Sequence, residues 1–199
     1  MGQDIEIEGK NLVTKDEFER IMKEWNLSYD QFTRQRNTYF DTEDFQIKGK
    51  KAALRIREKN NQWMLTLKEP HKDELLETNQ LLTEKEAERA IQTGHIPKGE
   101  VEKQLKISLS LTDIKKVNNL GTLTTYRLEL PYQKGELVFD HSTYLDKEDY
   151  ELEFEGKSRD HVDKVLMSIL DKYDIPKRET PNKIQRFFNR KSELTKKTE

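Results

Sequence analysis

The 199-residue sequence contains no cysteine, which excludes disulfide bonds, thiolate metal sites and a cysteine nucleophile. It also lacks any run that approaches the roughly 18 apolar residues of a membrane-spanning helix, and the acidic segment 1–10 lacks the apolar stretch of a signal peptide. Net charge is nearly absent as well, since 36 Lys and Arg stand against 38 Asp and Glu. We therefore expect a cytoplasmic protein that binds neither membranes nor nucleic acid.

Charge of both signs is abundant, at 37% of the residues, and it is accompanied by 8 Phe, 7 Tyr and 2 Trp. A disordered chain of this polarity usually carries a large net charge and few aromatic residues, so we expect a folded protein. The length suits one substantial domain. We place this domain at residues 1–191 and expect a frayed tail at residues 192–199.

Three amphipathic helices are predicted from N-caps that precede apolar residues at helical spacing. The caps are Thr14, Thr83 and Ser158, and each of the first two is followed three residues later by a Glu, as in a capping box. A weaker pattern over 100–117 predicts two short helical pieces, and 181–189 predicts a last turn or two.

Eight further segments alternate between apolar and polar residues with a period of two, which is typical of β-strands. They span Asp4–Asn11, Gln35–Thr42, Ala52–Lys59, Gln62–Glu69, Glu74–Leu82, Leu123–Tyr132, Gly135–Tyr144 and Glu148–Glu155. Asn60 and Asn61, between the third and the fourth, predict a tight hairpin. Because most of the strands are joined by short turns, we predict an α+β fold: an eight-stranded antiparallel closed β-barrel, or tunnel, with the helices packed on the outside.

The polar face of these strands repeats charge of one sign at every second position. The repeats are Glu6/Glu8, Arg55/Arg57 and Glu151/Glu153/Glu155. A solvated sheet face is the usual explanation, but neighbouring like charges repel, and the three helices need an apolar sheet surface to pack on. If the helices cover the outside, the charged face lines the interior, where unpaired charge is costly to bury. The interior is therefore a candidate site for a metal-bound polyphosphate.

The order of these motifs resembles the CYTH family, the group of class IV adenylate cyclases and thiamine triphosphatases that is also called the triphosphate tunnel metalloenzymes. The matching motifs are Glu6-x-Glu8-x-Lys10, Tyr39-Phe40-Asp41-Thr42, Ala53-Leu54-Arg55-Ile56-Arg57, Leu65-Thr66-Leu67-Lys68, Arg127 in Tyr-Arg-Leu-Glu, Asp140 in Val-Phe-Asp, Glu151-Leu-Glu-Phe-Glu155, and Lys183 in Pro-Asn-Lys. The resemblance extends over nearly the whole chain, and it implies that residues 1–191 form one CYTH-like tunnel-barrel domain.

The resemblance also implies a role for each matching residue. The expected ligands of a divalent cation, Mg²⁺ or Mn²⁺, are Glu6, Glu8, Asp140, Glu151, Glu153 and Glu155. The expected contacts to the triphosphate are the basic residues Lys10, Arg55, Arg57, Lys68, Arg127 and Lys183. Lys10, Arg57 and Asp140 are the residues expected to be catalytic. Which of the three final glutamates binds the metal is left open.

Three other residues are interpreted from their positions. Two roles remain open for Tyr39: a hydrogen bond to a substrate phosphate, or packing within the sheet. Lys59 and Arg36 are expected to be solvated side chains near a mouth of the barrel.

The leading interpretation is a metal-dependent hydrolase of inorganic triphosphate, or of a small organic triphosphate, bound in the barrel interior. The same resemblance keeps open the cyclisation of ATP, as in class IV adenylate cyclases. A non-catalytic module that binds polyphosphate or a nucleotide, and a scaffold whose charged faces are simply surface, are the further alternatives. The triphosphate is the expected small-molecule partner, and both a monomer and a homodimer remain open.

Overall fold

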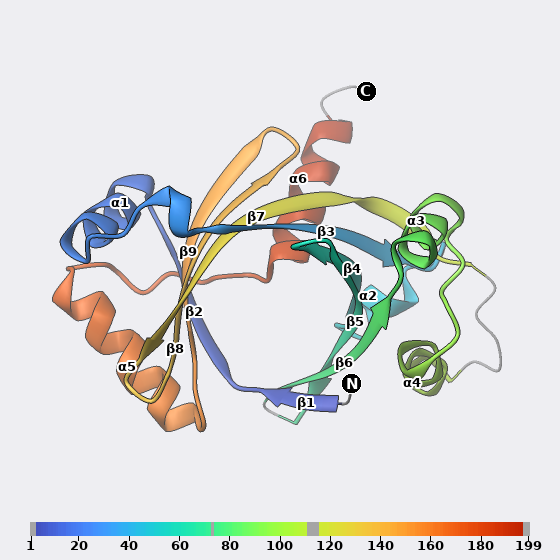
Figure 1. Ribbon diagram of the computed structural model, residues 1–199, viewed down its shortest axis with the longest axis horizontal. Helices are drawn as coiled ribbons and strands as arrows, with labels where there is room; N and C mark the ends of the chain where they lie inside the picture. The colour runs from blue at the N-terminus through green and yellow to red at the C-terminus, as the bar shows by residue number, and fades with distance from the viewer. Residues whose placement is uncertain (1–2, 73, 111–115, 197–199) are drawn as a thin grey trace. The chain divides into compact units, whose positions relative to one another are not determined.

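The computed structural model describes residues 3–72, 74–110 and 116–196 (Figure 1). The strands are β1 (Gln3–Glu6), β2 (Glu8–Val13), β3 (Thr33–Asp41), β4 (Ala53–Lys59), β5 (Gln62–His71), β6 (Glu74–Leu82), β7 (Asn118–Tyr132), β8 (Gly135–Tyr144) and β9 (Lys147–Glu155). The helices are α1 (Lys15–Glu24), the 3₁₀ turn η1 (Tyr29–Gln31), α2 (Gln46–Gly49), α3 (Glu84–Thr93), α4 (Glu100–Leu109), α5 (Arg159–Lys172) and α6 (Lys183–Lys196).

The strands form one antiparallel sheet in the order β1-β6-β5-β4-β3-β7-β8-β9-β2. Because the first and last strands of this order follow each other in the chain, separated by Ile7 alone, the order is that of a nearly closed barrel. The predicted α+β class and antiparallel barrel are thus confirmed. The predicted count of eight is wrong by one, because the segment Asp4–Asn11 is interrupted at Ile7. Its first part pairs with β6 and its second part with β9.

Two compact units divide the chain, and each has its own hydrophobic core. The first unit comprises Met1–Glu6 and Gln35–Thr122, and the second unit comprises Ile7–Arg34 and Leu123–Glu199. The single domain expected over 1–191 stays a prediction.

The core of the second unit lies between β8 and β9 on one side and α1 and α5 on the other. Leu152 and Phe154 of β9 are fully buried, as are Phe18 of α1 and Leu170 of α5. Each such side chain contributes about 1.5–3 kcal/mol through burial. The predicted caps are present, since the Oγ of Thr14 accepts from the backbone N–H of Glu17 and the Oγ of Ser158 caps α5.

The core of the first unit lies between β4 and β5 and the helices α3 and α4. Leu54, Leu65 and Leu67 are fully buried in it. The Thr83 capping box that begins α3 is present, and Gly94 ends the helix with a φ of 74°, a left-handed conformation that glycine adopts without strain. Over 100–117, where two short pieces were expected, the described residues form one helix, α4, and residues 111–115 lie outside the described part.

Two connections bear on the sequence predictions. Asn60 and Asn61 both have positive φ, at 53° and 60°, which confirms the tight hairpin between β4 and β5. At the other end of the chain, α6 continues to Lys196, further than the turn or two expected. The end of the predicted tail, 197–199, lies outside the described residues. None of the helices in the described part of the chain has the length and apolar character that a membrane crossing requires.

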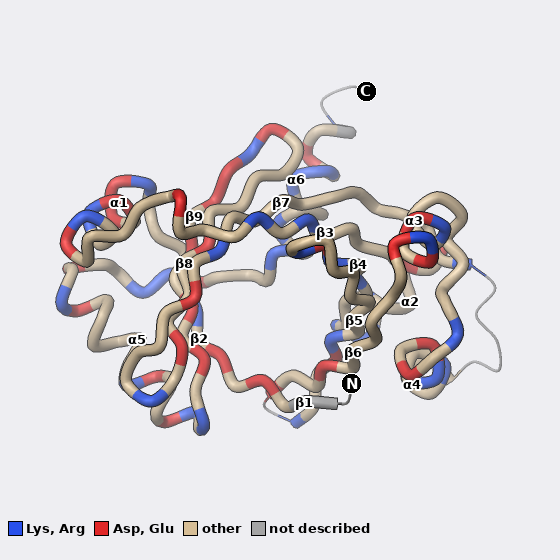
Figure 2. The backbone as a smooth tube through the Cα atoms, in the orientation of Figure 1, with Lys and Arg blue, Asp and Glu red and all other residues tan. Residues whose placement is uncertain are grey.

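In the first unit α3 and α4, and in the second unit α1 and α5, lie on the apolar face of the strands, so the charged residues occupy the opposite face. The start of α6 lies against this charged face in the second unit, where Lys183 contacts Glu151 and Glu153. In β9, for example, Glu151 and Glu153 alternate with the core residues Leu152 and Phe154. In β4, Arg55 and Arg57 alternate with Leu54 and Ile56. Figure 2 marks these charged positions along the strands. The charged face of each unit is therefore where a site for charged ligands can form.

Candidate functional site

The basic residues of the first unit are arranged in cross-strand rows on its charged face. Tyr39, Arg55, Thr66 and Asn79 form one row across β3, β4, β5 and β6. Asn37, Arg57, Met64 and Leu81 form the next row. Residues directly opposite each other in an antiparallel pair share a face. The register therefore places Arg55 and Arg57 on the same side as the polar residues of β5 and β6.

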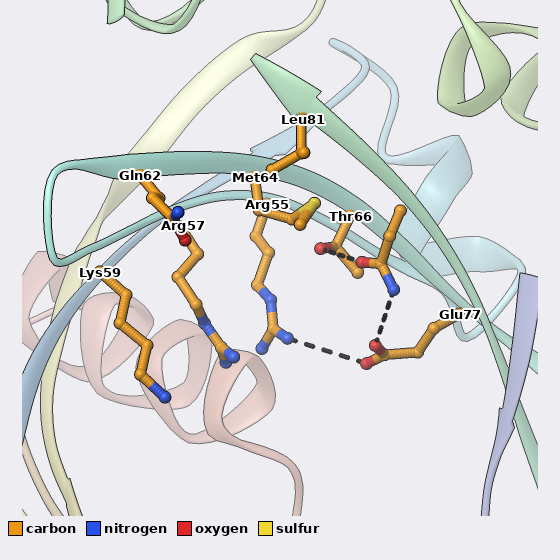
Figure 3. A pocket seen from close by; sticks show the side chains of 9 residues that line it. Arg55, Arg57, Lys59, Gln62, Met64, Thr66, Glu77 and Leu81 are labelled. Carbon is orange, nitrogen blue, oxygen red and sulfur yellow. Dashed lines mark hydrogen bonds and ion pairs between the residues drawn. The ribbon is translucent and has the colours of Figure 1, made fainter. Parts of the chain in front are cut away.

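A cavity of about 270 Å³ opens on this face (Figure 3). Its lining consists of Arg55, Arg57, Lys59, Gln62, Met64, Thr66, Glu77, Asn79 and Leu81. The side chains of Arg55, Arg57 and Lys59 extend in the same direction in Figure 3. Three cationic groups against the single carboxylate of Glu77 make this cavity suited to an anion.

Ion pairs connect the acidic end of this face to its basic residues. The Nζ of Lys68 lies 2.5 Å from a carboxylate oxygen of Glu6 and 2.5 Å from one of Glu77. The guanidinium of Arg55 is 3.7 Å from Glu77. Burial alone would raise the pKa of Glu77, but the Lys68 ammonium and the Arg55 guanidinium lower it to about 2. Glu77 is therefore ionised at neutral pH, and it positions both basic groups.

Arg57 is oriented by a neighbour in its own row. Its Nε donates a hydrogen bond of 2.8 Å to the Oδ1 of Asn37, which is buried at 2% exposure. A guanidinium held through Nε can direct its terminal nitrogens elsewhere, which is the arrangement that suits bidentate contact with a phosphate.

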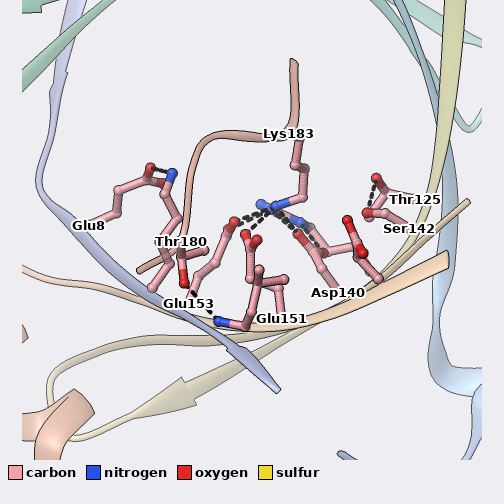
Figure 4. Close-up of polar contacts among 12 residues, drawn as sticks. Glu8, Thr125, Asp140, Ser142, Glu151, Glu153, Thr180 and Lys183 are labelled. Carbon is pink, nitrogen blue, oxygen red and sulfur yellow. Dashed lines mark hydrogen bonds and ion pairs between the residues drawn. The ribbon is translucent and has the colours of Figure 1, made fainter. Parts of the chain in front are cut away.

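A cluster of buried carboxylates lies on the charged face of the second unit (Figure 4). Asp140 of β8 is 0% exposed, and Glu151 and Glu153 of β9 are 1% and 3% exposed. Each of the three offers a ligand oxygen within 4.8 Å of the other two. Carboxylate oxygens at such distances are the donor set that hard divalent cations prefer. Asp140, Glu151 and Glu153 therefore fit a site for Mg²⁺ or Mn²⁺.

Three basic side chains pair with these acids. The Nζ of Lys183 lies 2.8 Å from Asp140 and 2.5 Å from each of Glu151 and Glu153 (Figure 4). Arg127 binds Asp140 through two hydrogen bonds and Glu153 through a third of 2.6 Å. Arg186 lies 2.6 Å from the second oxygen of Glu151.

The pKa values of this cluster follow from burial and from the ion pairs. Burial would raise the pKa values of Asp140 and Glu153, but the nearby cationic side chains lower both. Burial and the neighbouring Glu153 carboxylate raise the pKa of Glu151 to about 7, against the effect of Lys183. Of the three acids, Glu151 is thus the one that binds a proton most readily.

Glu8, Lys10 and Glu155 extend this face along β2 and β9. Glu8 lies opposite Glu155 in the strand register, and Lys10 lies opposite Glu153. The Nζ of Lys10 is 2.8 Å from the carboxylate of Glu8. Burial would lower the pKa of Lys10, but Glu8 and Glu153 raise it, so Lys10 stays cationic.

The structure thus brings the predicted residues together in two groups. In the first unit these are Glu6, Arg55, Arg57 and Lys68. In the second unit these are Glu8, Lys10, Arg127, Asp140, Glu151, Glu153, Glu155 and Lys183. Tyr39 is buried, with 4% exposure, in the row of Arg55.

Two basic residues that were not predicted to bind a ligand also lie near these groups. Lys59 was expected to be a solvated side chain, yet it lines the cavity beside Arg57. Its position two residues after Arg57 was the available signal. Arg186 follows Lys183 by three residues, so the helical period places both on one side of α6.

Comparison with known proteins agrees with this arrangement. The sequence matches the CYTH domain over residues 4–188, and the chain belongs to this family. A Bacillus subtilis protein named "Putative triphosphatase YjbK" is 45% identical over 192 residues, which cover 96% of this chain and 98% of that protein.

Two solved structures are also similar. A Bacillus halodurans protein described as a "putative adenylate cyclase" is 47% identical, with a TM-score of 0.89 over 94% of this chain and 100% of that chain. A Hippeastrum protein, HpAC1, described as a "putative adenylyl cyclase" with a dominant triphosphatase activity, shares the fold at 20% identity. Its TM-score is 0.77 over 93% of this chain and 95% of that chain.

Proposed function

We propose that the chain is a divalent-metal-dependent triphosphatase that hydrolyses inorganic triphosphate or a small organic triphosphate. The observation that carries the proposal is the buried acidic cluster of Asp140, Glu151 and Glu153, whose oxygens lie within 4.8 Å of one another. An acidic cluster of this kind on a CYTH chain suits the metal of a phosphoryl-transfer enzyme. The similarity to a protein named as a triphosphatase supports the same conclusion.

In this proposal Mg²⁺ or Mn²⁺ would be held by Asp140, Glu151 and Glu153, and by Glu6, Glu8 and Glu155 as further carboxylates. When bound, such a cation supplies charge neutralisation at phosphate oxygens and activation of a water molecule.

The basic residues carry the binding of the polyphosphate. Arg55 and Arg57, which line the cavity of the first unit, would donate to phosphate oxygens, together with Lys68. Lys10, Arg127 and Lys183 would do the same from the second unit. Donors that are already oriented, such as Arg57 on Asn37, stabilise the charge that develops on the phosphoryl oxygens without further reorganisation. Lys10, Arg57 and Asp140 are the residues proposed to be catalytic.

A second candidate function is the cyclisation of ATP, which the description of the Bacillus halodurans relative favours. The two reactions leave different products. Hydrolysis releases phosphate and a shortened polyphosphate, whereas cyclisation releases cyclic AMP and pyrophosphate.

The test is a substrate screen with the purified full chain. Tripolyphosphate, ATP, GTP and thiamine triphosphate are each incubated with Mg²⁺ and with Mn²⁺, and the products are identified by chromatography. We expect phosphate release that a chelator abolishes. Formation of cyclic AMP from ATP would contradict the hydrolase and support the cyclase. Metal-dependent binding without turnover would contradict both enzymes and support a binding module.

A further inference from the structure

The charge of the buried acidic cluster is already balanced by side chains. Among the described residues of the second unit, Asp140, Glu151 and Glu153 pair with Lys183, Arg127 and Arg186. Three negative groups thus face three positive ones in a nearly dry environment. A divalent cation that enters this cluster adds two positive charges, so its binding favours the departure of one of the basic groups.

Lys183 is the basic group that competes with a metal most directly. Its ammonium contacts all three acids at 2.5–2.8 Å. A cation that binds one oxygen of each acid would take the position among the three carboxylates that the Lys183 ammonium occupies. Arg127 and Arg186 each contact only part of the cluster among the described residues. Arg127 pairs with Asp140 and Glu153, and Arg186 is shared between Glu151 and Asp149.

Lys183 also differs from the three acids in that its backbone belongs to no strand. The three acids and Arg127 lie within strands, where hydrogen bonds to both neighbouring strands hold the backbone. Lys183 is the first residue of α6, and it follows the segment 175–182, which has neither helix nor strand. Movement at this helix start breaks no strand pairing.

We propose that the Lys183 ammonium is an internal substitute for the metal, which holds the acidic cluster together until a divalent cation displaces it. The displaced ammonium is then available to an anion that accompanies the metal. The inference rests on the proposed function, because the cation in question is the metal of the triphosphatase. What it adds is an exchange in which this metal takes the place of the Lys183 ammonium. Metal affinity in the absence of triphosphate is then set by Lys183 as well as by the acids.

The experiment is a titration of the full chain with Mn²⁺ alone, followed by calorimetry or by the electron paramagnetic resonance of free Mn²⁺. Wild type is compared with Lys183→Met, with Lys183→Gln in case the Met variant does not fold, and with Lys172→Met as the control. Lys172 is an exposed lysine of the same unit, paired with Glu24. We expect at least a tenfold lower Kd for Mn²⁺ in the Lys183 variants and an unchanged Kd in the control.

A second readout follows the movement in the wild-type protein itself. Hydrogen exchange of the backbone amides at the start of α6 should become faster when Mn²⁺ binds, since displacement of Lys183 loosens this end of the helix. An equal or weaker affinity in the Lys183 variants would overturn the exchange but leave the metal site intact. Failure of every protein to bind Mn²⁺ would overturn both the exchange and the metal dependence of the proposed function.

Discussion

Arg127 and Asp140 face each other across β7 and β8, and two hydrogen bonds of 2.8 and 2.6 Å join the guanidinium to both oxygens of the carboxylate. Asp140 is fully buried, and this bidentate pair compensates its charge together with Lys183. The same guanidinium reaches Glu153 at 2.6 Å. The pair therefore holds two members of the acidic cluster at a fixed distance, and it links the stability of the second unit to the geometry of its candidate site.

Replacement of Asp140 by Asn should destabilise the protein strongly, because it leaves the buried Arg127 and Lys183 with one carboxylate fewer. Breaking a buried ion pair by removing one partner costs about 3–5 kcal/mol. Urea unfolding followed by circular dichroism measures the loss. Asp146→Asn, which removes an exposed partner of Arg190, is the control and should leave the unfolding midpoint nearly unchanged. Equal effects of the two substitutions would contradict the account of the cluster.

Gly9 separates Glu8 from Lys10 and lies against α5. A Cβ atom added at Gly9 would be 2.8 Å from the Cγ1 of Val162 and 3.2 Å from the Cδ2 of Leu166. Gly9→Ala should therefore force α5 away from β2 and lower the free energy of unfolding by about 1–3 kcal/mol. Gly49→Ala is the matched control, because a Cβ there meets nothing within 4 Å. The two variants are compared by urea unfolding, and a stable Gly9→Ala protein would show that the contact can relax.

The pH dependence of stability should reveal the ion pair between Glu77 and Lys68. The pKa of Glu77 is lowered from its ordinary value of 4.5 to about 2 in the folded protein. A depressed pKa stabilises the folded state above pH 4.5, and this contribution is lost as the pH falls toward 2. Its size is on the order of 2 kcal/mol once partial exposure of the pair is allowed for.

The measurement compares wild type with Glu77→Gln in urea at several pH values. The difference in free energy of unfolding between the two proteins should be largest at pH 6 and should shrink between pH 4.5 and 3. A difference that does not vary with pH would mean that Glu77 is not held ionised by its neighbours.

Much of the fold follows from local patterns in the sequence. The alternation of Leu152 and Phe154 with Glu151 and Glu153 identifies both faces of β9, and α1 and α5 pack on the apolar one. The Thr14 and Thr83 capping boxes mark helix starts correctly because they depend only on residues three positions apart.

Other features depend on contacts between distant segments, and local patterns do not contain them. The alternation continues through Ile7 without a break, yet the strand changes partner there from β6 to β9. Similarly, the sequence indicates that Lys183 belongs to the site, but not that its ammonium contacts three acids from two strands. The side-chain pairing of buried charges is a property of the tertiary structure.

The most direct test of the central claim, that the charged face of the sheet binds and hydrolyses a triphosphate, compares Arg57 with Arg36. The two arginines are on neighbouring strands, and Arg57 lines the cavity whereas Arg36 is exposed to solvent. Phosphate release from tripolyphosphate with Mg²⁺ is measured for Arg57→Ala and Arg36→Ala, with circular dichroism to verify folding. We predict a fall in kcat/KM of about 100-fold or more for Arg57→Ala, and about wild-type activity for Arg36→Ala. Full activity of a folded Arg57→Ala protein would contradict the account.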